Sequence, residues 1–334
     1  MKILHTADWH LKAKHKYTKP VEGKVWDELF EEKMKILNLL PRVIQKYDCD
    51  SVVISGDLFD NTNPNTSIKA EVCKLINKFI NLKVSTYIIP GNHETSSFGN
   101  NVLMDLAKAY GVSERIYIYH SDTDNLSIDA KIGVFHVMME GIDPRFNKGI
   151  VEYSDERFKN CNTILLGDYH AFYQRHFGKK FFTYPGPPYP TRLGEHGNSV
   201  SIIDVDDDGN FLNLKKVRLP SYSFIEIKHT FKEGDEIDLD IFSDKKYIVK
   251  CIVYCSADSM KTAFMKFKDV KEKWLNEEKC LDFDYIVKTK TLSNSEQIDI
   301  QKKTVKEVAI EHIEKNAPYP NATKKLFNTY IGGV

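Results

Sequence analysis

Five short groups of metal-ligand residue types occur within the first 170 residues, and each directly follows an apolar segment that favours a β-strand. In chain order they are Asp8-Trp9-His10, Gly56-Asp57-Leu58-Phe59-Asp60, Gly91-Asn92-His93-Glu94, His136 and Gly167-Asp168-Tyr169-His170. Loops that leave a sheet at neighbouring strand ends can bring such side chains together. Carboxylate, amide and imidazole ligands in one place favour manganese, iron or zinc over calcium. The pattern therefore predicts two adjacent metal ions that cleave a phosphoester.

The spacing of these residues suggests how the ligands are arranged. Asp8 and His10 are two residues apart in a segment expected to be extended, so both side chains would point to one side and bind one ion. Asp168 and His170 repeat this spacing. Asp57 follows a buried strand and a glycine that allows a sharp turn, where a carboxylate can bridge the two ions.

Four further residues complete the predicted site. Asn92 offers a carbonyl oxygen and His136 ends a strand, so both are candidate ligands. His93 stands beside a ligand and is the candidate that gives a proton to the leaving oxygen, with support of a neighbouring ligand as the alternative. Asp60 either orients a histidine such as His93 or caps the turn that follows.

Composition limits the classes of protein that the chain can belong to. With 47 acidic and 47 basic residues the formal net charge is zero, so any contact with DNA must come from local basic patches. The 6 cysteines lack the C-x-x-C spacing of structural zinc sites and are expected to be reduced core residues. Neither a signal peptide nor an apolar stretch of membrane-spanning length is visible, which predicts a soluble cytoplasmic protein without membrane contact.

Strands and amphipathic helices are expected to alternate up to about residue 124, as in βαβ units with a largely parallel sheet. The expected strands are 2–6, 51–55, 84–89 and 115–119, and the expected helices are 25–47 (broken or kinked at Pro41), 67–81 and 102–110. The pattern then turns mostly β, with strands expected at 126–129, 131–136, 163–166, 199–204 and 211–217. These elements predict an α/β fold, a four-layer α/β/β/α sandwich over residues 1–220.

The acidic cluster Asp206-Asp-Asp-Gly-Asn210 lies between the last two of these expected strands. Its residue types are those of a hairpin turn, and they also faintly resemble a calcium loop. Because no acidic residue stands at the closing position of such a loop, the turn is the favoured interpretation.

Beyond Pro220 the pattern predicts a small α/β domain over 221–292 and a helical tail over 293–334. The small domain would contain strands 223–228, 247–254 and 283–289, and a helix whose apolar stripe comprises Met260, Phe264, Phe267, Val270 and Trp274. A unit of this size is expected to cap the first domain. The tail would form two short helices whose apolar face needs burial against its own domain or a partner.

The ordered motifs resemble the signature of the calcineurin-like metallophosphoesterases: Asp-x-His, Gly-Asp-x-x-Asp, Gly-Asn-His-Glu/Asp, His and Gly-His-x-His. More narrowly, Thr6-Ala-Asp-Trp-His-Leu11 and Gly56-Asp-Leu-Phe-Asp60 are similar to the SbcD-type nuclease of double-strand-break repair and recombination, most of all to its short phage versions. The segment Tyr184-Pro-Gly-Pro-Pro-Tyr-Pro-Thr-Arg-Leu-Gly-Glu195 matches that family's Tyr-Pro-Gly-Ser segment, which ends in a similar Gly-Glu. The resemblance covers nearly the whole chain and implies a metallophosphoesterase sandwich, a capping domain that binds DNA and a helical tail.

The resemblance also implies a division of the ligands between two divalent ions, with manganese the expected metal. One ion would take Asp8, His10, Asp57 and His170, and the other Asp57, Asn92, His136 and the residue at 168. The family has histidine where this chain has Asp168. Because aspartate also binds manganese, and its charge makes an ion's water less acidic, we expect a working site with altered metal preference.

Basic residues flank the predicted site and are candidates for contacts with the DNA backbone. They are Lys12, Lys14 and Lys16 after the first ligands, Arg175 after the last ligands, and Arg192 in the Tyr-Pro-Gly segment. The simpler alternative is that each is a solvated surface residue.

The leading hypothesis is a metal-dependent DNA nuclease that hydrolyses phosphodiesters with a hydroxide activated by two metals. The resemblance implies exonuclease action on duplex ends, endonuclease action on single strands, a homodimer, and an SbcC-type coiled-coil ATPase bound by the tail. It also implies a cytoplasmic location, in the host cytoplasm if a phage encodes the chain. The alternatives are a phosphatase or nucleotide phosphodiesterase with another substrate, and a metal-depleted scaffold suggested by Asp168.

Overall fold

The computed structural model describes residues 1–15, 23, 25–95, 102–110, 114–119, 121, 131–143, 150–193, 195, 198–232, 247–277 and 280–289. The chain divides into two compact units, Met1–Phe224 and Ile225–Val334. The division falls inside a strand, a few residues after Pro220. Each unit has its own hydrophobic core.

A six-stranded sheet forms the centre of the first unit, with the order β12-β11-β1-β2-β3-β4. Its strands are β1 (Lys2–Thr6), β2 (Ser51–Ser55), β3 (Ser85–Ile89), β4 (Ile116–Ile118), β11 (Ser199–Val205) and β12 (Phe211–Arg218). The strands β1 to β4 run parallel, whereas β11 and β12 are antiparallel additions next to β1. The carboxyl ends of β1, β2 and β3 therefore meet at one edge of the sheet, as the alternation of strands and helices predicted.

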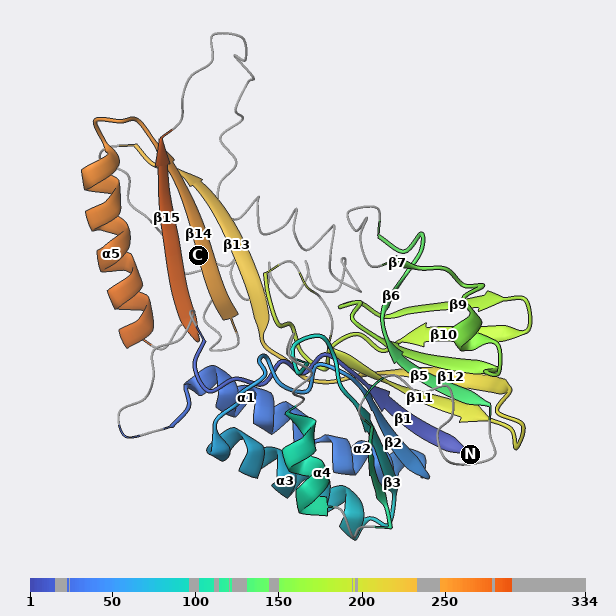
Figure 1. Ribbon diagram of the computed structural model, residues 1–334. Coiled ribbons are helices and arrows are strands. Elements are labelled where there is room, and N and C mark those ends of the chain that lie inside the picture. Colours follow the sequence, from blue (N-terminus) through green and yellow to red (C-terminus); the bar gives the residue numbers. More distant parts are fainter. Residues whose placement is uncertain are drawn as a thin grey trace. The chain divides into compact units, whose positions relative to one another are not determined.

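Four helices cover one face of this sheet (Figure 1). They are α1 (Glu28–Leu37), α2 (Leu40–Tyr47), α3 (Thr66–Asn81) and α4 (Leu103–Tyr110). The helix expected from residue 25 begins three residues later, because the Asp27 side chain accepts a hydrogen bond from the N–H of Phe30 and caps the first turn. The break expected near Pro41 is confirmed, and the proline occupies the first turn of α2, where its missing N–H costs nothing.

A four-stranded sheet, of order β5-β8-β10-β9, packs on the other face of the six-stranded sheet. Its strands are β5 (Ile132–His136), β8 (Thr163–Gly167), β9 (Tyr173–Phe177) and β10 (Lys180–Tyr184). Buried apolar side chains of both sheets, such as Val53, Tyr87, Val134 and Leu165, form one core between them. The outer face of this sheet is covered, within the described residues, by β6 (Met138–Met139), β7 (Ile150–Val151) and the 3-10 turn Glu156–Phe158. The predicted α/β sandwich is thus confirmed.

The hairpin of β9 and β10 was not predicted from the sequence. The side chains of Gln174, Arg175, His176 and Phe177 are all exposed on this edge strand, so no buried apolar period marks it. The expected strand 126–129 lies outside the described residues. The turn favoured for 206–210 is confirmed, since both carboxylate oxygens of Asp206 accept hydrogen bonds from Asn210.

The described part of the second unit is a three-stranded sheet with one helix against it. Its elements are β13 (Ser223–Thr230), β14 (Tyr247–Cys255), α5 (Met260–Asn276) and β15 (Asp282–Thr289). The helix buries Ala263, Phe267 and Trp274 against the sheet. The predicted stripe was too wide: Met260 and Phe264 stay 44% and 53% exposed, because they lie on the flank of the buried period.

The tail predicted over 293–334 lies outside the described residues. Among the helices that are described, none is both long and apolar enough to cross a membrane.

Candidate metal centre

The candidate ligands come from loops at the carboxyl ends of strands in both sheets. Asp8 and His10 follow β1, Asp57 follows β2, Asn92 follows β3, His136 ends β5, and Asp168 and His170 follow β8. The predicted ligands therefore converge on the edge where the two sheets meet. His10 and His170, for example, are in contact there although 160 residues separate them in the sequence.

The backbone at this edge is not extended, which corrects the argument used for Asp8 and His10. Their φ angles are 57° and 44°, and those of Asp57 and Asp168 are 50° and 89°, all in the left-handed region that non-glycine residues seldom adopt. The loop after β1 is held in this shape because the N–H groups of Asp8 and His10 donate to the carbonyls of Gly56 and Asp57. Unusual φ values at ligand positions are typical of functional sites.

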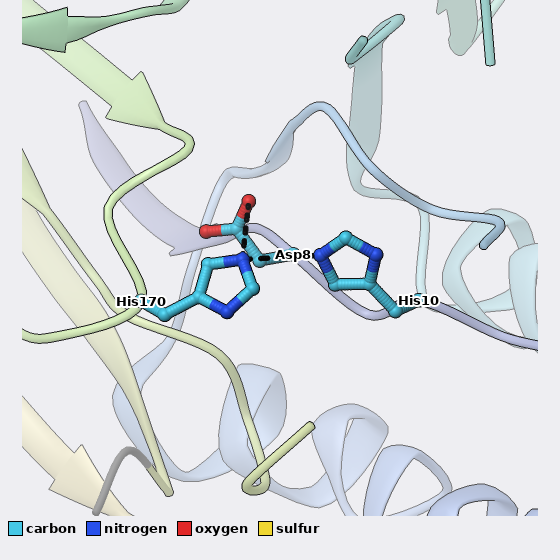
Figure 2. Close-up of side chains that lie close together, drawn as sticks. All are labelled: Asp8, His10 and His170. Atoms are coloured by element: carbon cyan, nitrogen blue, oxygen red, sulfur yellow. Dashed lines mark hydrogen bonds and ion pairs between the residues drawn. The ribbon is translucent and has the colours of Figure 1, made fainter. Parts of the chain in front are cut away.

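Asp8, His10 and His170 form the first ligand group (Figure 2). His10 Nε2 lies 3.1 Å from His170 Nε2, and His170 Nε2 lies 4.0 Å from Asp8 Oδ1. Asp8 is fully buried, and within the described residues its Oδ2 has no hydrogen-bond partner. A buried carboxylate oxygen and two facing imidazole nitrogens are ligand atoms that a divalent cation would satisfy.

Asp8, Asp57 and His136 form the second ligand group. Asn92 joins it with its side-chain oxygen 3.1 Å from His136 Nε2, and its amide group also lies beside the Asp57 carboxylate. Carboxylate, amide and imidazole groups that meet at one point offer the ligand atoms that a divalent cation such as manganese or zinc takes. The residues present therefore fit a metal ion here as well.

The charges of the site favour a cation. Although burial opposes it, the Asp57 and Asp8 carboxylates raise the pKa of His136 to about 10. Burial likewise opposes ionisation of Asp57, but contacts with His136 and His10 lower the pKa of that carboxyl. The negative charge of these carboxylates, which keeps His136 protonated, would also stabilise a divalent cation.

Asp168 lies at the margin of the second group. Its Oδ1 is 3.9 Å from His136 Nε2, its side chain is 36% exposed, and its backbone N–H donates to Asp8 Oδ1 at 3.0 Å. Burial and the neighbouring Asp8 and Asp57 carboxylates raise its pKa. Asp168 therefore lies beside the candidate ligands but belongs to neither of the two ligand groups described above.

His93 is positioned by both the β2 and β3 loops and is 41% exposed. Its backbone N–H donates to Asp57 Oδ1, its ring Nδ1 lies 3.1 Å from the carbonyl oxygen of Asp60, and its Nε2 lies 4.0 Å from Asp57 Oδ2. The Asp60 carboxylate instead contacts His10 Nδ1 at 3.5 Å and Lys12 Nζ at 2.8 Å. The histidine that the Asp60 carboxylate faces is therefore His10, whereas His93 contacts the Asp60 backbone carbonyl.

Three buried charged residues next to the ligands received no role from the sequence. Glu94 accepts hydrogen bonds from the backbone N–H groups of Asp57, Phe59 and Gly91. Glu195 contacts His170 Nδ1. Lys33, 1% exposed, donates to the carbonyl of His10.

The sequence contained a signal for two of these residues. Lys33 stands on the apolar face of its helix between Phe30 and Leu37, where a lysine is unexpected. Glu195 closes the segment 184–195, whose motif was noted without a function.

Two glycines are required by the close approach of the loops. A Cβ atom on Gly91 would lie 2.0 Å from Asp57 Oδ1, and one on Gly167 would lie 1.9 Å from the carbonyl oxygen of Ser55. The glycines of the two motifs thus let the backbone pass directly behind the ligands.

Two of the predicted DNA-contact residues lie next to the site, since Lys12 pairs with Asp60 and Arg192 pairs with Glu195. Lys14, Arg175 and Arg192 are exposed, and Lys12 is half-buried against Asp60. The Arg175 guanidinium lies 4.7 Å from the centre of the Tyr153 ring. Lys16 lies outside the described residues.

The sandwich, with Asp and His residues that could hold metal ions at the edge between its sheets, fits a metallophosphoesterase. Residues 1–182, more than half of the chain, match the family model for the calcineurin-like phosphoesterases, and the chain belongs to this family. It is similar to the DNA double-strand break repair protein Mre11 of Methanosarcina mazei, with 22% identity over 303 residues that cover 81% of this chain and 47% of the relative. It is also similar to Mre11 of Methanosarcina acetivorans, with 24% identity over 311 residues that cover 81% of this chain and 48% of the relative. The chain thus spans about half the length of the curated relatives it matches.

Solved structures give a weaker comparison. Vps29 from Entamoeba histolytica, complexed with zinc, aligns over 65% of this chain and 99% of its own, with 12% identity and a TM-score of 0.33. A TM-score this low carries no argument about this chain.

Proposed function

We propose that the protein is a metal-dependent DNA nuclease of the kind that acts in double-strand-break repair and recombination. One observation carries the chemical part: Asp57 Oδ2 lies 3.4 Å from His10 Nε2 and 3.4 Å from His136 Nε2, so one carboxylate serves both ligand groups. A carboxylate within reach of both ligand groups would allow them to hold two ions side by side. The similarity to the Mre11 repair proteins supports DNA as the substrate.

The two ions would be divided as the family resemblance implies, and manganese suits the mixture of carboxylate, amide and imidazole ligands. Asp8, His10, Asp57 and His170 would hold one, and Asp57, Asn92, His136 and Asp168 the other. Such ions, when bound, supply a water of lowered pKa and positive charge next to the phosphate oxygens.

His93 is the residue we assign to the leaving oxygen. Its Nδ1 can donate to the Asp60 carbonyl, which fixes the ring and leaves Nε2 facing the space beside Asp57. In the imidazolium form Nε2 carries a proton that it can give to the departing 3′ or 5′ oxygen. The ring is 41% exposed, so a substrate can contact it.

Contacts with the DNA would be made by Lys12, Lys14 and Lys16, and by Arg175 and Arg192. Exposed lysine and arginine side chains bind phosphates without reading the base sequence, so binding would weaken as salt increases. We further propose action on duplex ends and on single strands, a homodimer, and an SbcC-type ATPase bound by residues 293–334. These parts rest on the family resemblance.

The test is degradation of end-labelled linear duplex DNA by the full chain in manganese, magnesium or chelator. The Asp57→Asn variant removes the bridging charge. Asp155→Asn is the matched control, because Asp155 is a partly exposed carboxylate paired with Arg157. We expect manganese-dependent cleavage that Asp57→Asn abolishes and Asp155→Asn keeps.

A small diester, bis(p-nitrophenyl) phosphate, is assayed in parallel to separate substrate from chemistry. Hydrolysis of the diester without cleavage of duplex or single-stranded DNA would overturn the DNA assignment and favour a nucleotide phosphodiesterase or phosphatase. Inactivity on both substrates, from folded protein that binds no manganese, would favour the metal-depleted scaffold.

A further inference from the structure

Glu195 places a buried carboxylate directly behind His170. Its Oε1 lies 2.5 Å from His170 Nδ1, and its side chain is 8% exposed. The other ring nitrogen, Nε2, faces His10 and Asp8 in the first ligand group (Figure 2). A neutral imidazole can bind a metal ion through only one nitrogen, and the partner of the other nitrogen decides which one. The contact with Glu195 assigns the proton to Nδ1 and the lone pair to Nε2.

The Glu195 carboxylate is itself held rigidly. Its Oε2 accepts hydrogen bonds from the Thr191 N–H at 2.7 Å, the Thr191 hydroxyl at 2.8 Å and the Arg192 N–H at 3.2 Å. Its Oε1 accepts from Arg192 Nε at 2.7 Å in addition to its contact with His170. These hydrogen bonds hold the carboxylate in a fixed position against His170.

We propose that Glu195 is the positioning residue of the first ligand group: it fixes the orientation and tautomer of His170 and makes Nε2 a stronger ligand. A carboxylate that accepts the second N–H of a metal-bound histidine has this effect in metalloproteins generally. The proposal gives a function to the segment 184–195, because Thr191 and Arg192 in this segment donate the hydrogen bonds that hold the Glu195 carboxylate in place. It rests on the metal centre of the proposed function and is independent of whether the substrate is DNA.

A simpler role for Glu195 would be to close its own loop. The hydrogen bonds to Thr191 and Arg192 would then matter for stability, and the contact with His170 would be incidental. The two roles differ in what they do to metal binding. Loop closure affects the melting temperature alone, whereas positioning of His170 affects the affinity for one of the two ions.

The experiment is a titration of the metal-free full chain with Mn²⁺, followed by calorimetry and by electron paramagnetic resonance of free Mn²⁺. Glu195→Leu removes the acceptor and the charge, and Glu195→Gln keeps an acceptor oxygen without the charge. We expect about 10-fold to 100-fold weaker binding of one ion in Glu195→Leu, the range found when such partners are removed. Glu195→Gln should fall between this variant and the wild type.

Asp155→Asn is again the matched control, because it removes a carboxylate that pairs with an arginine and caps a turn away from the ligands. It should bind both ions as the wild type does. Urea denaturation of each variant reports stability separately. If Glu195→Leu does not fold, Glu195→Gln decides the question.

Binding of both ions within about threefold of the wild type, in a Glu195 variant that is less stable, would overturn the proposal and leave loop closure. Wild-type protein that binds no Mn²⁺ would overturn it together with the metal centre. Absence of DNA cleavage by a protein that still shows the affinity difference would contradict the nuclease assignment alone.

Discussion

Glu94 Oε2 accepts a hydrogen bond from the backbone N–H of Asp57 at 3.1 Å, and both residues are buried. The same carboxylate accepts from Phe59 N–H at 2.7 Å and Gly91 N–H at 2.6 Å. One side chain from the loop after β3 thus ties the loop after β2 in place. The position of Asp57 between the two ligand groups depends on this contact.

Replacement of Glu94 by alanine should destabilise the fold strongly. It would leave three buried N–H groups without an acceptor, each of which costs about 1–3 kcal/mol. We expect a loss of at least about 3 kcal/mol in the free energy of unfolding, measured by urea denaturation. Glu94→Gln keeps one acceptor oxygen and should lose less. A change below about 1 kcal/mol in Glu94→Ala would contradict the structural role given to this carboxylate.

His93→Gln should separate chemistry from metal binding. The ring of His93 faces the space beside Asp57, and its backbone N–H, which contacts that carboxylate, is unaffected by the substitution. We expect kcat on DNA to fall by about 10²-fold to 10⁴-fold, the usual contribution of a general acid. Mn²⁺ affinity should stay unchanged in the same titration. Weaker binding of an ion together with the loss of rate would instead make His93 a support of the ligands.

Asp168 allows a test of the second ion. Asp168→Ala should weaken binding of one ion by at least about tenfold, since loss of a ligand costs no less than loss of its supporting partner. Asp168→His restores the residue type of the family motif and should recover the affinity. Mn²⁺ titration and a comparison of activity in manganese, zinc and magnesium measure both effects. Unchanged occupancy and activity in Asp168→Ala would show that Asp168 is not a ligand.

His5 makes stability depend on pH away from the ligands. It is fully buried in β1, with Nε2 against Ser55 Oγ at 2.6 Å, and burial lowers its pKa from 6.5 to about 3. Between these two pKa values the imidazole is protonated in the unfolded chain but neutral in the folded protein. The free energy of unfolding therefore falls as the pH is lowered through this range. The slope from this group is at most about 1.4 kcal/mol for each pH unit.

The measurement for His5 is the free energy of unfolding by urea at several pH values from 7 to 4. His5→Asn cannot titrate in this range, so its stability should fall less steeply than that of the wild type. Parallel curves for the two proteins would show that His5 does not contribute to acid sensitivity.

Much of the site could be predicted from the sequence because its signals are local. An apolar run followed by Asp57, or by Asp168 and His170, indicates a strand end with candidate ligands, and these residues do lie at one edge of the sandwich. The alternation of strands and helices likewise indicated the parallel order from β1 to β4. Both inferences need only the period of a strand or helix and the chemistry of a side chain.

The backbone at the ligands could not be predicted in this way. Asp8 and His10 were expected in an extended segment, but the chain is held at positive φ by carbonyls of Gly56 and Asp57, almost fifty residues away in sequence. The edge strand β9 was missed for a related reason. Backbone hydrogen bonds pair it with β10, and its exposed side chains do not alternate between apolar and polar as those of a half-buried strand would.

By itself the sequence determined which residue types stand at the strand ends, their order, and therefore the class of site and fold. Only the tertiary structure decided that Glu94 ties two loops together, that Glu195 faces His170, and that Lys33 is buried against the His10 carbonyl. In the sequence Glu94 looks like an ordinary surface charge, and the signals at Lys33 and Glu195 do not indicate which groups they contact. Their roles come from hydrogen bonds between distant segments, and such bonds depend on how the two sheets and their loops pack, which no local pattern records.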